Sequence, residues 1–223
     1  MRIRPKILIG TMAFVLAMSA GANVITIGYT NVAERISNNS LGGVAPSSYV
    51  GQFSNKWVDR SFWVFELPEL LPGQTLVSAT FRVNLILIDG VTNNADLYHV
   101  QDFNHSLLVT NDYDLGTATL TAGSFVTPTS VTGQYYTVDV TADILADYAL
   151  DPSDAQYATF RAQLDDSGSI RGTSSRRYRF ASDNVADPNQ PELILEIIPE
   201  PASVSLFLLS GLGIVLVRHR LRS

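Results

Sequence analysis

Apolar and polar residues alternate with a period of two through the middle of the chain. The string Phe-Arg-Val-Asn-Leu at 81–85 puts its apolar residues on one face of an extended segment. In residues 160–164, Arg161 and Gln163 fall on the polar face in the same way. The alternation recurs in residues 61–67, 136–140, 176–180 and 193–198. Turn-forming strings such as Asp-Pro-Ser-Asp separate these segments, so the pattern predicts an all-β, antiparallel β-sandwich.

The same alternation predicts which aromatic rings form the core. Trp63 and Phe65 share a face with Leu67, and Tyr178 alternates with Phe180. Rings on the apolar face of a half-buried strand pack inward, so we expect these side chains in the core.

One short helix is predicted, beginning at Thr141. The Thr141 side chain can cap the free amides of the next three residues, Asp143 suits the positive first turn, and Ile144, Leu145 and Tyr148 recur at helical spacing. We expect this helix to close one open end of the sandwich.

Residues 101–134 have a different composition. They are rich in Thr, Ser, Gly and Asp, with only brief apolar runs. This composition predicts long surface loops that hold two weak strands.

The N-terminal residues predict a signal peptide over 1–22. Three basic residues precede an apolar run at 7–20, and Ala20 and Ala22 provide the small residues that a signal peptidase accepts. We expect cleavage after Ala22. An uncleaved N-terminal anchor is the alternative.

The C-terminal residues 199–223 have three parts in a fixed order. Pro199-Glu200-Pro201 is followed by sixteen uncharged residues and then by a basic cluster that contains Arg218, Arg220 and Arg222. The apolar run is short of the roughly 20 residues that cross a bilayer comfortably, and the arginines fit a positive-inside anchor. This order resembles the PEP-CTERM sorting tail of bacterial envelope proteins. The resemblance implies transient membrane insertion, removal of the tail by an exosortase, and delivery to the envelope, outer surface or extracellular matrix of a Gram-negative-type bacterium that makes exopolysaccharide.

The predicted mature domain, residues 23–198, is acidic. Six of the 15 Lys and Arg residues lie in the terminal segments, so nine basic residues face twenty acidic ones, a net charge of −11. This charge argues against nucleic acid and other polyanions as bulk electrostatic partners, since any such attraction needs a local basic patch. The chain has no cysteine, which excludes disulfides and thiolate chemistry.

Several segments of this domain occur in a recognisable order. They are residues 63–68, 78–83, 138–141, 178–182 and 189–193. Across about residues 50–198 this order resembles the DNRLRE-type jelly-roll domains of secreted bacterial proteins. The resemblance implies a jelly-roll-like sandwich related to carbohydrate-binding modules, some of which accompany polysaccharide-degrading enzymes.

The candidates for glycan contact are two rings and two cations. Sugar sites on sandwiches use exposed aromatic rings beside polar groups, and Trp57, Tyr135, Arg177 and Arg179 are the residues that fit. The alternative is an ordinary solvated face on which the arginines pair with neighbouring acids.

Candidate catalytic and metal-binding chemistry is sparse. His99 and His105 lie six residues apart without a metal-binding motif, and we expect surface or turn histidines. The paired acids are Asp112 with Asp114 and Asp165 with Asp166. We expect turn formers, with glycoside hydrolysis and a structural calcium ion as alternatives for these carboxyls.

Two functions remain open. We expect a non-catalytic exported envelope or matrix protein that contacts exopolysaccharide. The alternative is a secreted polysaccharide-acting lyase or hydrolase of jelly-roll type. A domain of this size has little room for a long substrate cleft beside its core, which favours the first function.

Overall fold

A computed structural model describes residues 22–29, 35–37, 44–45, 48–53, 57–101, 110–114, 117–150, 156–165, 174–181 and 189–199. Ala22–Ile198 form one compact unit. Several predicted residues lie outside the described ones: Ala20, His105, Asp166, Glu200, Pro201, Arg218, Arg220 and Arg222. Among the residues described, no helix is long and apolar enough to cross a membrane.

The described elements are mostly strands, and every strand pairing with a defined register is antiparallel. The strands are β1 (Asn23–Gly28), β2 (Arg35–Ser37), β3 (Val44–Ala45), β4 (Ser48–Phe53), β5 (Trp57–Glu66), β6 (Gln74–Asp89), β7 (Ala95–Gln101), β8 (Thr117–Val126), β9 (Gln134–Asp139), β10 (Tyr157–Leu164), β11 (Arg176–Phe180) and β12 (Glu192–Pro199). The helical elements are the 3-10 turn η1 (Thr110–Asp114) and the helix α1 (Thr141–Leu150). The predicted antiparallel β class with one short helix is confirmed.

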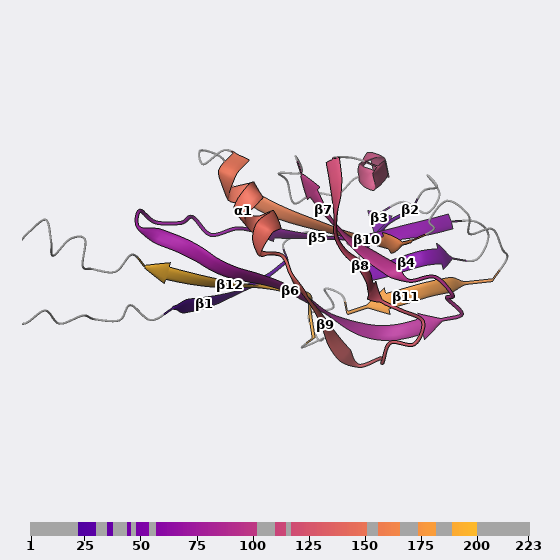
Figure 1. The fold of residues 1–223 in the computed structure, drawn as a ribbon. Coiled ribbons are helices and arrows are strands. Elements are labelled where there is room, and N and C mark those ends of the chain that lie inside the picture. The colour runs from indigo at the N-terminus through magenta and orange to yellow at the C-terminus, as the bar shows by residue number, and fades with distance from the viewer. Residues whose placement is uncertain are drawn as a thin grey trace, which may run out of the picture. The chain divides into compact units, whose positions relative to one another are not determined.

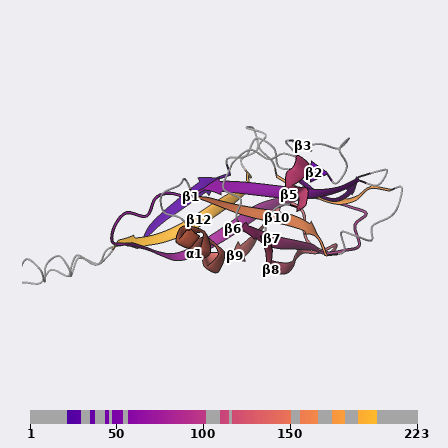
Figure 2. The same cartoon turned by 90° about the horizontal axis from the view of Figure 1, so that it is seen from above.

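The strands form one curled sheet. Its hydrogen-bonded order is β1-β12-β6-β11-β4-β5-β10-β7-β8, while β9 pairs with β6, and β2 pairs with β3 and β5. In Figure 1, β5, β7 and β10 lie above β6, β11 and β12, and Figure 2 shows the same strands from above.

The aromatic core shows how far the sheet curls. Strands β6 and β5 are separated by β11 and β4, which in a flat sheet would place them roughly 14 Å apart. The ring centroids of Trp63 on β5 and Phe81 on β6 are nevertheless 5.2 Å apart, and those of Phe81 and Phe160 on β10 are 5.3 Å apart. The two halves of the sheet therefore face each other across one core.

The predicted core residues are buried. Trp63, Phe65, Leu67, Tyr178 and Phe180 all belong to the main apolar cluster. Burial of these large side chains supplies the principal driving force for closing the curled sheet.

Strands β5 and β10 are covered on both faces, which the alternation did not predict. Phe62, Val64 and Val100 form a second buried cluster on the outer side. Arg161, expected on a polar face, is only 7% exposed, so that expectation was wrong. The reason is tertiary: the outer face of these strands is covered by further residues, among which Tyr113 and Tyr157 pack on the second cluster.

Among the described residues of the segment 101–134, one long strand lies where loops with two weak strands were predicted. It contains η1 and the ten-residue strand β8, which pairs with β7 through two register shifts. Strand β8 ends the hydrogen-bonded order of the sheet, and most of its residues are exposed or half-buried. A strand that buries little surface needs few apolar residues, so its sequence pattern is weak.

Helix α1 begins where predicted but is capped by a different residue. The Thr141 amide and hydroxyl both donate to Asp139 Oδ1, at 3.0 and 2.6 Å, and the Thr141 hydroxyl accepts from the Ala79 amide at 2.9 Å. Thr141 thus anchors the helix to β6, while Asp139 provides the negative cap. The helix contacts both β6 and β10, with Ile144 in the core.

Candidate functional sites

The most unusual polar cluster lies beneath helix α1. His99 on β7 is fully buried, and its Nε2 lies 2.9 Å from both carboxylate oxygens of Asp147. Its Nδ1 lies 3.6 Å from Asp143 Oδ1. Asp143 and Asp147 are four residues apart and therefore share one face of the helix.

Burial governs the ionisation of this cluster. Desolvation raises the pKa of Asp147, and the hydrogen bond and charge of His99 offset part of that rise. A buried carboxylate is tolerated only with a partner of this kind. His99 and Asp147 therefore form a buried hydrogen-bonded pair that links β7 to α1.

The predicted surface position of His99 was wrong. Strand β7 lies between β8 and β10, and the His99 ring packs against Phe160 at a centroid distance of 5.7 Å. The sequence offered one clue, the spacing of Asp143 and Asp147 on a single helix face. Nothing in it connected that face to His99.

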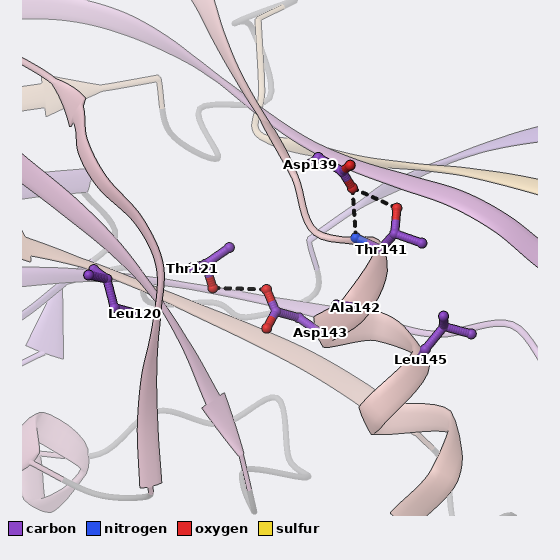
Figure 3. A pocket seen from close by; sticks show the side chains of 7 residues that line it. All are labelled: Leu120, Thr121, Asp139, Thr141, Ala142, Asp143 and Leu145. Atoms are coloured by element: carbon purple, nitrogen blue, oxygen red, sulfur yellow. Dashed lines mark hydrogen bonds between the residues drawn. The ribbon is translucent and has the colours of Figure 1, made fainter.

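A hollow opens beside this cluster, between β8 and the start of α1 (Figure 3). Its volume is about 510 Å³, and its lining consists of Leu120, Thr121, Asp139, Thr141, Ala142, Asp143 and Leu145. In Figure 3 the Thr121 hydroxyl points toward Asp143, and it donates to Asp143 Oδ2 at 2.9 Å.

The chemistry of the hollow is mildly acidic. The hydrogen bonds from the Thr141 side chain and backbone lower the pKa of Asp139, so this carboxylate stays ionised. Asp143 is already bonded to Thr121, and His99 behind it is fully buried. In the described part of the chain, no cluster of three or more His, Asp or Glu side chains is placed to hold a metal ion.

Tyr135, a predicted glycan contact, lies on β9 with 36% of its surface exposed. The Arg82 guanidinium lies 4.8 Å from its ring centroid, and the Tyr135 hydroxyl donates to Asn189 Oδ1 at 3.5 Å. Arg82 is itself held by a salt bridge to Glu192. An exposed ring thus stands among a cation, a carboxylate and an amide.

The predicted cations Arg177 and Arg179 both lie near the ring of Tyr49, which was not among the predicted glycan contacts. Their guanidinium carbons lie 4.4 and 5.7 Å from the ring centroid of Tyr49 on β4. Tyr49 faces Arg179 directly across the β4–β11 pairing, so strand register brings these residues together. Arg177 Nε also lies 3.8 Å from Asp89.

Trp57 occupies the first position of β5 and is half-buried. Its cross-strand partner is Phe53, whereas Tyr135 lies on β9 opposite Asn84 of β6. The four predicted glycan residues therefore do not form one cluster in the strand order: Arg177 and Arg179 form a pair, while Trp57 and Tyr135 lie on other strands.

The predicted acid pairs occupy dissimilar surroundings. Asp112 is buried, whereas the Asp114 side chain is 79% exposed and its Oδ1 accepts from Arg60 at 2.5 Å. Asp165 is exposed and follows the last residue of β10. Asp112 and Asp114 do not share one environment in which they would act as paired carboxyls.

No family model and no curated protein matches this sequence.

Proposed function

We propose that the protein is an exported, non-catalytic component of the bacterial envelope or extracellular matrix. In this proposal an exosortase-type system sorts it, and its domain is a jelly-roll-like sandwich that contacts exopolysaccharide. The observation that carries the proposal is the order of the C-terminal tail, Pro199-Glu200-Pro201, an uncharged run and an arginine cluster. The basic and apolar N-terminal residues support export by the same route.

The curled sheet supports a binding role for the domain. Two sheet halves packed across an aromatic core form a rigid scaffold, and its outer side presents tyrosines next to arginines. A tyrosine ring offers an apolar face to a sugar ring, and neighbouring polar groups satisfy sugar hydroxyls. Tyr135 is the best-placed ring, because it is exposed and lies beside Arg82 and Asn189.

The enzyme alternative has no comparable support among the described residues. His99 is fully buried, and Asp112 and Asp114 lie in different surroundings. A reducing-sugar and unsaturated-product assay on a panel of bacterial polysaccharides distinguishes the two functions, since a matrix protein releases no product.

Intact-mass measurement of protein from the native cell envelope tests the sorting proposal. We expect a mature chain that begins at Asn23 and lacks residues 204–223. A Pro199→Ala/Pro201→Ala variant should keep its tail, whereas Ala202→Ser should be processed normally. Wild-type protein that retains residues 204–223 would refute sorting and indicate a permanent anchor.

A further inference from the structure

Two arginines lie close together on the outer face of the sheet. Arg161 on β10 pairs with Phe62 of β5 on one side and with Tyr98 of β7 on the other. Arg60 precedes Phe62 by two residues, so it shares that face and is a diagonal neighbour of Arg161. Diagonal positions on adjacent strands are about 7–8 Å apart, within reach of two long side chains and one shared ligand.

Each guanidinium lies near an aromatic ring. The Arg60 carbon Cζ is 4.0 Å from the centroid of Tyr113 in η1, and that of Arg161 is 5.5 Å from the centroid of Tyr98. Contact with a ring restricts the guanidinium plane and leaves its edge available for hydrogen bonds. The two cations are therefore partly preorganised.

Both arginines carry a buried donor that has no acceptor. The Nε of Arg60 and the Nε of Arg161 are inaccessible to solvent and make no hydrogen bond within the described part of the chain. Arg161 is 7% exposed, and the Arg60 side chain is 11% exposed. A buried charged donor without a partner is costly, so two of them on neighbouring strands favour the binding of an anion.

The charged groups around Arg60 and Arg161 also favour the binding of an anion. Arg60 Nη1 donates to the Tyr113 carbonyl and to Asp114 Oδ1, both at 2.5 Å. No carboxylate among the described residues forms an ion pair with Arg161. Burial lowers the pKa of Arg161 to about 10, the Arg60 charge adds to that effect, and the Asp114 carboxylate offsets part of it. An added anion would relieve both the desolvation and the repulsion.

We propose that Arg60 and Arg161 form a binding site for a tetrahedral oxyanion of the sulfate or phosphate class. The negative charge of such an anion offsets the two guanidinium charges, and its oxygens accept paired N–H donors from arginine edges. The exposed Asp114 carboxylate occupies part of the Arg60 edge and competes with the ligand. The site is a local basic patch on an otherwise acidic domain, and it is independent of the tail and of the glycan contacts at Tyr135.

Isothermal titration of the full-length protein tests this site, with inorganic sulfate, a sulfated oligosaccharide and its unsulfated counterpart as probes. Sodium chloride at matched ionic strength serves as the blank. We expect heat of binding for sulfate, for the sulfated sugar or for both, and in each case more heat than the unsulfated sugar gives. Binding of the sulfated sugar alone identifies a polymer-borne group, whereas equal binding of inorganic sulfate identifies a free anion.

Matched variants separate this site from general charge effects. Arg161→Met and Arg161→Lys should each weaken binding at least tenfold, because lysine keeps the charge but lacks the paired donors. Arg176→Gln, which removes an exposed arginine elsewhere, should leave binding unchanged. Asp114→Asn should strengthen binding severalfold. Circular dichroism verifies that each variant is folded. If Arg161→Met does not fold, the binding measured for Arg161→Lys tests the proposal. No heat with either sulfated probe, or equal heat in Arg161→Lys and wild type, would overturn the proposal.

Discussion

Both carboxylate oxygens of Asp147 lie 2.9 Å from Nε2 of His99, although 48 residues separate the two side chains. This contact joins the buried strand β7 to helix α1. It places a carboxylate in the interior, where the His99 ring is its hydrogen-bond partner. Stability should therefore depend on the pair rather than on either residue alone.

His99→Phe is expected to destabilise the domain by about 3–5 kcal/mol at pH 7, because it leaves Asp147 buried without its partner. The double variant His99→Phe/Asp147→Leu should recover most of that loss. Urea unfolding of the three proteins measures both effects.

The pKa of Asp147 is raised by burial, and an acid of this kind favours the folded state when protonated. The loss in His99→Phe should therefore shrink toward about pH 4. If the double variant loses as much unfolding free energy as His99→Phe, the proposed coupling between His99 and Asp147 is contradicted.

Alkaline conditions should weaken the fold through Tyr148. Burial raises the pKa of Tyr148 to about 12, and its hydroxyl donates to the Pro68 carbonyl at 2.8 Å. A group with a raised folded-state pKa stabilises the fold below its unfolded pKa, about 10 for tyrosine. That stability is lost as the pH rises from about 10 to 12. Unfolding free energies of wild type and Tyr148→Phe should converge over this range. Below it Tyr148→Phe should be less stable by roughly 1 kcal/mol, and parallel curves would refute the assignment.

Trp63→Ala should cost on the order of 3–5 kcal/mol, because Trp63 is fully buried and joins the two halves of the curled sheet through Phe81 and Phe180. Trp57→Ala is the matched control, since Trp57 is half-buried at the start of the same strand. Its cost should be clearly smaller. Thermal unfolding compares the two, and equal losses would show that the core does not depend on the Trp63 contact.

Gly51→Ala should destabilise the protein by roughly 2 kcal/mol or more. Gly51 has φ of +119°, and an added Cβ would clash with the Arg176 carbonyl oxygen of the neighbouring strand β11. Gly28→Ala, where nothing lies within 4 Å of the added carbon, should stay within about 0.5 kcal/mol of wild type. Chemical denaturation distinguishes them, and a tolerated Gly51→Ala would refute the close approach of β4 and β11.

Tyr135→Ala should weaken retention on isolated exopolysaccharide about tenfold, or roughly 1–2 kcal/mol, with little change in thermal stability. Tyr135→Phe keeps the ring and should retain most of the binding. Contacts through Arg177 and Arg179 to an anionic glycan would be screened at about 1 M salt, whereas ring stacking would persist. If wild-type protein shows no retention on its host's polysaccharide at any salt concentration, glycan contact is excluded.

Local sequence pattern was sufficient for several features of this protein. The period of two identified segments within β5, β6, β9, β10, β11 and β12, but not β1 to β4 or β7. It also predicted the inward direction of Trp63, Phe65 and Phe180, because successive side chains on a strand point to opposite faces. The start of α1 at Thr141 was also readable, since helix spacing and first-turn acids are short-range features. Strand β8 was less evident, because a largely exposed terminal strand carries little apolar periodicity.

The tertiary structure decided which faces meet and which polar groups are enclosed. Alternation cannot show that β5 and β10 are covered on both sides, so it misplaced Arg161 on a polar face. It also cannot join His99 to Asp147 or place Arg60 near Arg161, since the first contact requires α1 to pack on the sheet and the second requires β5 to pair with β10. The physical reason is that a sequence pattern reports each residue's local face, whereas burial and charge pairing depend on segments brought together from distant parts of the chain.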